Sequence, residues 1–65
     1  MYNIDLYKIG LADGRSSAKK VAMSMQPAIN YNIYLKKKQY SKNNPHDLYS
    51  KGFIYGYEEE IGCYE

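Results

Sequence analysis

The chain has 65 residues, one cysteine and a net charge of +2. A chain of this length forms one small domain with little room for an enclosed catalytic cleft, and a single cysteine allows no intrachain disulfide. No apolar run reaches the roughly 20 residues of a membrane span, so we expect a single cytoplasmic domain (residues 1–65) without a membrane segment.

The first predicted element is a helix over about residues 4–14, capped at Asn3 or Asp5. Gly14 is expected to break this helix, and a second helix is predicted near residues 17–26. Apolar residues at helical spacing support the second helix: Ala18, Val21, Ala22 and Met25.

Residues 28–42 support two interpretations. Apolar residues alternate with polar ones as in a strand: Ile29, Tyr31, Ile33 and Leu35. Pro27, which is expected to end or redirect the preceding helix, would also suit the first position of a new one, and Asn44-Pro45 would suit its end. As a helix, the segment would present its apolar residues on two faces rather than one. The helix is favoured because a lone strand in so small a chain has no partner.

One motif, Asp-Leu-Tyr-x-x-Gly-(Leu/Phe)-x-x-Gly, occurs at residues 5–14 and again 42 residues later, at residues 47–56. Asp47 is a suitable cap for a last helix over about residues 47–60. Glycine within a helix costs roughly 1 kcal/mol against alanine, so two glycines on one face of each helix indicate close approach of another backbone. We predict that the two helices cross through Tyr7, Gly10, Gly14, Tyr49, Gly52, Phe53 and Gly56.

The charge is strongly partitioned along the chain. The segment between residues 15 and 46 contains no acidic residue, and its cations are Arg15, Lys19, Lys20, Lys36, Lys37, Lys38 and Lys42. Such segregation favours a polyanionic partner for this basic segment. The alternative is a solvated segment that is balanced internally by Glu58, Glu59 and Glu60.

Nine tyrosines and no tryptophan give the chain a strong aromatic bias. Tyr31, Tyr34 and Tyr40 interleave with the lysines of the basic segment, a pattern that suits base stacking and phosphate contacts in RNA, with Arg15 as a further stacking residue. Tyrosine is also enriched in protein interfaces, and it can serve as the main core residue of a small chain. The predicted RNA- or partner-binding residues are Arg15, Lys19, Lys20, Tyr31, Tyr34, Lys36, Lys37, Lys38, Tyr40 and Lys42.

The residues that catalysis or metal binding would require are scarce. His46 and Cys63 are the only residues of their types, and neither has a companion at ligand spacing. The sequence also lacks a phosphate-binding glycine loop of the G-x-x-x-x-G-K-S/T kind. We therefore predict no catalytic residues, no metal and no cofactor, in a protein that is not an enzyme.

Three short segments resemble the ribosome modulation factor family of small bacterial hibernation proteins. Gly10-Leu11-Ala12-Asp13-Gly14-Arg15-Ser16 is similar to the glycine-rich segment of that family's first helix. Asn44-Pro45-His46 corresponds to its Pro-aromatic turn, and Gly52-Phe53 corresponds to the Gly-Trp step of its second helix. The resemblance implies two helices and binding to the ribosome. Small proteins with this motif pair also look common among phage-encoded inhibitors of host machinery.

Together these features predict a mainly α, small single domain in which two glycine-faced helices cross. The leading functional prediction is a non-enzymatic protein of the bacterial cytoplasm that binds RNA or the ribosome through its basic, Tyr-rich middle segment and blocks a functional surface. The alternative is a phage-type inhibitor or adaptor that binds a host protein complex in the host cytoplasm. A homodimer is compatible with either prediction.

Overall fold

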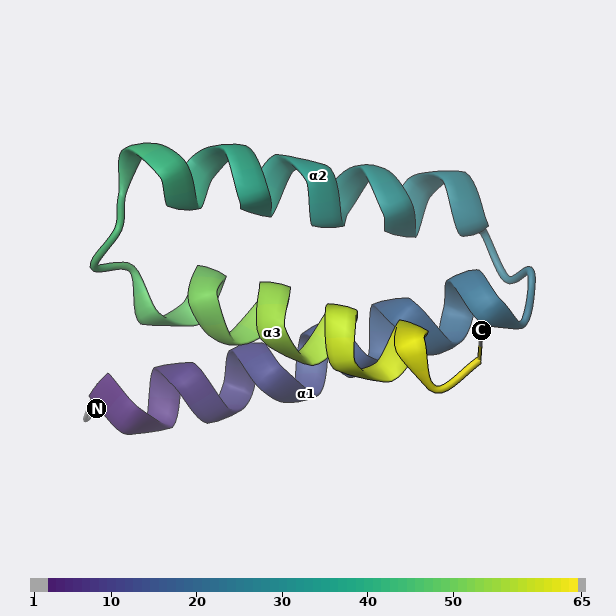
Figure 1. The fold of residues 1–65 in the computed structure, drawn as a ribbon, viewed down its shortest axis with the longest axis horizontal. Coiled ribbons are helices and arrows are strands. Elements are labelled where there is room, and N and C mark those ends of the chain that lie inside the picture. The colour runs from purple at the N-terminus through teal and green to yellow at the C-terminus, as the bar shows by residue number, and fades with distance from the viewer. Residues whose placement is uncertain (1–2, 65) are drawn as a thin grey trace.

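In the computed structural model, which describes residues 3–64, three helices are joined by two short turns (Figure 1). Helix α1 spans Asn3–Ala22, α2 spans Pro27–Asn43 and α3 spans Leu48–Gly62. The predicted mainly α fold is confirmed. The strand interpretation of residues 28–42 is wrong, because α2 covers the whole segment and residues 3–64 contain no strand.

Helix α1 continues through Gly14, so the predicted break at this residue and the separate helix near residues 17–26 are wrong. Gly14 lies where a Cβ would meet the backbone of Phe53. Its small size therefore serves close packing and not helix termination. α1 also begins at Asn3, so Asp5 lies in its first turn and is not its cap.

The turn between α1 and α2 uses two residues with left-handed backbone conformations. Ser24 has a φ of 57° and Gln26 a φ of 51°, in a region that residues other than glycine adopt at a cost. Pro27 then starts α2, where its fixed φ suits a first turn and its missing N–H is not needed. The buried Asn30 side chain holds the turn, because its amide nitrogen donates to the carbonyl oxygens of Met25 (3.3 Å) and Gln26 (2.9 Å).

Helix α3 begins with the cap that the sequence predicts. The Asp47 carboxylate accepts a hydrogen bond of 3.0 Å from the Ser50 amide. The hydrogen bonds from Ser50 lower the pKa of Asp47, because they stabilise its charged form. The helix extends to Gly62, slightly beyond the predicted end near residue 60.

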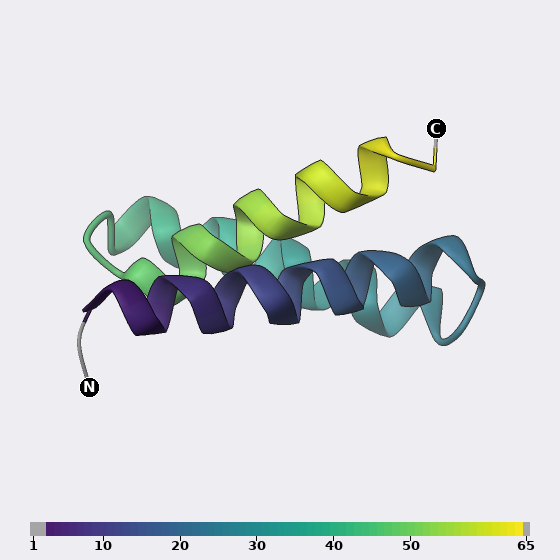
Figure 2. The same cartoon turned by 90° about the horizontal axis from the view of Figure 1, so that it is seen from below.

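Helices α1 and α3 run in the same direction and cross at their glycine faces (Figure 2). A Cβ on Gly10 would lie 2.9 Å from the Phe53 amide nitrogen and closer still to the Tyr49 carbonyl oxygen. A Cβ on Gly52 would in turn strike the carbonyl oxygen of Tyr7. Contacts of this kind leave no room for a side chain, so the predicted glycine crossing is confirmed.

The second glycine of each motif repeats this arrangement one turn further along. A Cβ on Gly14 would lie 2.9 Å from the Tyr57 amide nitrogen, and a Cβ on Gly56 would lie 3.0 Å from the Leu11 Cα. The two copies of the motif therefore use the same residues in the same way, each placing its glycines against the other's backbone. The repeat in the sequence corresponds to a parallel helix pair with approximate internal symmetry.

Helix α2 runs lengthwise along this pair in the opposite direction and completes a small core (Figure 1). Its Tyr34 ring stacks on Tyr57 of α3, with the ring centroids 4.1 Å apart and an angle of 10° between the planes. Ala18 and Phe53 are also buried in this cluster. Within α2 only Tyr34 and Asn30 are buried, so this helix packs through one narrow face.

Candidate functional site

Helix α2 exposes apolar side chains on both sides of its narrow packed face. On the side toward α1, which we call the α1 flank, lie Ile29, Ile33, Lys36 and Tyr40. On the opposite side, which we call the α3 flank, lie Tyr31, Leu35 and Lys38. This is the split into two faces that the sequence predicts for a helical residue 28–42 segment.

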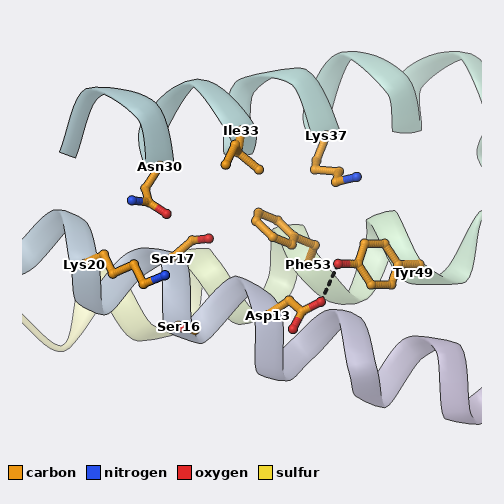
Figure 3. Close-up of a pocket in the computed structure, with 9 residues that line it drawn as sticks. All are labelled: Asp13, Ser16, Ser17, Lys20, Asn30, Ile33, Lys37, Tyr49 and Phe53. Atoms are coloured by element: carbon orange, nitrogen blue, oxygen red, sulfur yellow. Dashed lines mark hydrogen bonds between the residues drawn. The ribbon is translucent and has the colours of Figure 1, made fainter. Parts of the chain in front are cut away.

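A groove runs between the α1 flank and helix α1 (Figure 3). One part has a volume of about 360 Å³ and is lined by Asp13, Ser16, Ser17, Lys20, Asn30, Ile33, Lys37, Tyr49 and Phe53. A second hollow of about 340 Å³ adjoins it and is lined by Ile33, Lys36, Lys37 and Tyr40. The two hollows adjoin at Ile33 and Lys37, and the second is lined by α2 residues alone; together we call them the α1–α2 groove.

Two polar contacts fix the aromatic floor of the α1–α2 groove. The Tyr49 hydroxyl donates a hydrogen bond to the Asp13 carboxylate (Figure 3). Burial and this bond to Asp13 raise the pKa of Tyr49 to about 12. The Lys37 ammonium lies 5.1 Å from the centroid of the Tyr49 ring and 6.0 Å from that of Phe53, within cation–π range. The floor is therefore held by contacts from α1 and α2, and the Lys37 ammonium lies over it.

The charges on the α3 flank are engaged inside the protein. The Tyr34 hydroxyl donates to the Glu58 carboxylate, and the Lys38 ammonium lies 3.4 Å from the same carboxylate. Burial, followed by the bond to Glu58, raises the pKa of Tyr34. Arg15 of α1 forms a 2.5 Å ion pair with Glu59. Two of the three glutamates at 58–60 therefore contact cations of the basic segment, as the internal-balance alternative predicts.

These contacts change the interpretation of several predicted binding residues. The Tyr34 ring is buried against Tyr57, so in this structure it is not exposed for stacking on RNA. The guanidinium of Arg15 is bound to Glu59, and Lys37 and Lys38 are held by aromatic rings and Glu58. The remaining predicted residues are exposed: Lys19, Lys20, Tyr31, Lys36, Tyr40 and Lys42. The structure thus brings Lys20, Lys36, Lys37 and Tyr40 to one groove and leaves Lys19, Lys38 and Lys42 outside it.

Sequence reasoning missed the residues that shape the α1–α2 groove: Asp13, Ser17, Asn30 and Ile33. Ile33 had a signal, because it belongs to one of the two apolar faces expected for a helix over residues 28–42. Asp13 and Ser17 had none, since their role depends on how α2 lies along the helix pair. Asn30 is a polar residue in the packed face of α2, and only its contacts with the preceding turn explain its burial.

Within residues 3–64, no group of three or more His, Cys, Asp and Glu residues is placed to hold a metal ion. In the same range, no helix has the length and apolar character that crossing a bilayer requires. Comparison with known protein families, curated proteins and solved structures finds no match to this chain. The resemblance to the ribosome modulation factor family stays a prediction. The fold and site define a small three-helix domain that displays an amphipathic groove.

Proposed function

We propose that this protein is a non-enzymatic binding module, an inhibitor or adaptor, that binds a partner protein through α2. The observation that carries the proposal is the exposure of large apolar side chains along this helix: Ile29, Tyr31, Ile33, Leu35 and Tyr40 are between 37% and 57% exposed. Contiguous exposed apolar surface on a small protein often marks an interaction site. An interface with another protein would give them a role.

The kinds of side chain favour a protein partner over RNA. Three of the five exposed apolar residues are aliphatic (Ile29, Ile33 and Leu35), and aliphatic side chains do not stack on bases as aromatic rings do. Aliphatic and tyrosine side chains beside one another are typical of the central part of a protein interface. Tyr40 is half exposed and would serve as an aromatic anchor.

RNA or ribosome binding is the second candidate, and one observation favours it. Among the described residues, Lys19, Lys20, Lys36 and Lys42 have no carboxylate within 4.0 Å. Of these, Lys36 lies beside the exposed Tyr40, an arrangement that would suit phosphate and base contacts. The resemblance of the glycine segments to the ribosome modulation factor family points the same way. RNA binding would weaken steeply with salt, by about 0.7 log unit per log unit of salt for each single-strand phosphate contact.

The test is affinity capture from bacterial lysate, with and without nuclease, using tagged protein. Recovered proteins are identified, purified and titrated against the wild-type protein and two variants. Ile33→Ser and Tyr40→Ser are each expected to weaken binding by about 30-fold, the factor that corresponds to a 2 kcal/mol hot spot. The matched control is Tyr55→Ser, since Tyr55 is 55% exposed but lies on α3.

Circular dichroism on each variant separates loss of binding from loss of folding. Capture that survives nuclease and fails with both α2 variants supports the protein-binding proposal. Capture that nuclease abolishes decides for RNA. Unchanged binding in both α2 variants would mean that the partner does not use α2, which would refute the proposal.

A further inference from the structure

We infer that the α1–α2 groove receives an acidic amphipathic helix of the partner protein. The inference rests on the proposed function and adds two things to it: which side of α2 is used, and the chemistry of the segment that binds there. Three properties of the groove carry it, namely its length, its charge and the contrast with the α3 flank.

The α1 flank has the length that a partner helix requires. Ile29, Ile33 and Tyr40 occur at positions i, i+4 and i+11 along α2, a line of about 16 Å at 1.5 Å per residue. That length matches about three turns of a second helix. The Phe53 and Tyr49 rings lie at the bottom, with Ile33 on one wall (Figure 3). Apolar residues at i, i+4 and i+7 of a partner helix would fill such a groove.

The positive charge of the groove favours a partner helix that carries acidic residues beside its apolar face. Lys20 on α1 and Lys36 and Lys37 on α2 line its walls. Asp13 is the one lining carboxylate among the described residues, and it already accepts the Tyr49 hydroxyl. Ammonium groups on both walls with a single engaged acid between them form a positive trough. Glutamate or aspartate beside the apolar ridge of the partner would face these cations.

The α3 flank of α2 lacks the charge that would attract an acidic helix. Its lysine, Lys38, is paired with Glu58. Apolar residues are present there too, but no unpaired charge among the described residues of that flank would select a partner. Both flanks therefore expose apolar surface, and only the α1 flank adds a charge preference.

The experiment uses a labelled synthetic peptide of about 18 residues, long enough for roughly five helical turns, with leucines on one face and glutamates beside them. A second peptide has lysine in place of every glutamate, and a labelled single-stranded RNA oligonucleotide is the third probe. Binding to the intact protein is followed by fluorescence anisotropy. The acidic peptide is expected to bind roughly tenfold more tightly than the basic one.

Matched variants locate the site. The double variant Lys20→Gln, Lys36→Gln removes two groove cations and is expected to lower the affinity for the acidic peptide roughly tenfold. Lys19→Gln with Lys42→Gln removes the same charge outside the groove and is expected to change the affinity less than about twofold. Ile33→Ser should also weaken the peptide. Equal effects of the two double variants, equal binding of both peptides, or no binding would overturn the inference.

Two further outcomes would assign the groove to another occupant and also overturn the inference. RNA that binds more tightly than the acidic peptide and displaces it would assign the groove to nucleic acid. Self-association that Ile33→Ser abolishes would assign it to a second copy of the chain. Titrating the captured partner protein against these variants distinguishes failure of the acidic-helix inference from failure of the proposed binding through α2. Sensitivity to Ile33→Ser but not to Lys20→Gln with Lys36→Gln would refute the acidic helix and retain α2 as the binding element.

Discussion

Gly10 and Gly52 occupy equivalent positions at one helix crossing, each against the backbone of the other's helix. A Cβ on Gly10 would strike the Tyr49 carbonyl oxygen, and a Cβ on Gly52 would strike that of Tyr7. Backbone cannot move aside as the end of a flexible side chain can. The helices must therefore separate before either site can hold a methyl group.

We predict that Gly10→Ala and Gly52→Ala each destabilise the protein by about 1–3 kcal/mol, the usual cost of overpacking. Helix propensity alone would favour alanine by roughly 1 kcal/mol, so the sign of the change is informative. Thermal unfolding should show each midpoint lowered by about 4 °C or more. The double variant should be non-additive, because separating the helices for one methyl group makes room for the other.

Gly62→Ala is the matched control, because a Cβ there meets nothing within 4 Å. With open space and a helical position, alanine should leave the melting temperature unchanged or raise it. Higher melting temperatures for Gly10→Ala and Gly52→Ala as well would contradict the close crossing.

The crossing could be predicted from sequence because glycine at two repeated positions reports a backbone contact directly. The continuity of α1 could not be predicted, because the sequence around Gly14 is the same whether this glycine ends a helix or allows another helix to pack closely. The apolar residues Ile29, Tyr31, Ile33 and Leu35 alternate as in a strand because α2 packs through one narrow face and exposes apolar residues on both sides of it. The groove depends on where α2 lies, and local sequence does not contain that information.

The burial of Tyr49 and its bond to Asp13 predict an alkaline limit to stability. The pKa of Tyr49 is raised from an ordinary value of about 10 to about 12, so the folded state favours the neutral phenol. Its stabilising contribution is complete below about pH 10 and is lost as the pH rises toward 12. Chemical denaturation measured across this range should show stability falling, and Tyr49→Phe should fall less steeply.

Asp13→Asn provides a second measurement on the same pair. It removes the negative charge and leaves burial, which is the larger cause of the shift, in place. The Tyr49 phenol should therefore ionise at a lower pH in the variant, although still above its ordinary value, in an ultraviolet titration. An unchanged titration in Asp13→Asn would contradict the contact.

The turn between α1 and α2 depends on a single hydrogen-bond donor, the side-chain nitrogen of Asn30. Its side-chain nitrogen donates to the carbonyl oxygens of Met25 and Gln26. Asn30→Asp keeps the shape and replaces this donor with a carboxylate oxygen facing the same two acceptors. We expect a loss of about 1–3 kcal/mol at neutral pH, the range for leaving buried polar groups unsatisfied. The loss should shrink below about pH 4, where the new carboxyl is protonated and can donate.

Asn32→Asp is the control for this change, since it adds the same charge to the same helix at an exposed position. Its effect on unfolding should stay within about 0.5 kcal/mol. Equal losses in the two variants would mean that charge on α2, and not the turn, determines the result.

Tyr34 and Tyr40 test whether the tyrosines of the basic segment have separate roles. Tyr34 is buried against Tyr57 and Tyr40 is half exposed on the α1 flank. Tyr34→Ala removes a large core ring, and we expect a cost of about 3–5 kcal/mol, enough to unfold much of a domain this small. Tyr34→Phe keeps the ring and removes only the bond to Glu58, so it should cost about 0.5–1.5 kcal/mol.

Tyr40→Ala should change stability by about 0.5 kcal/mol or less. Denaturant titration of the three variants gives the order, and a stable, folded Tyr34→Ala would contradict a structural role for this ring.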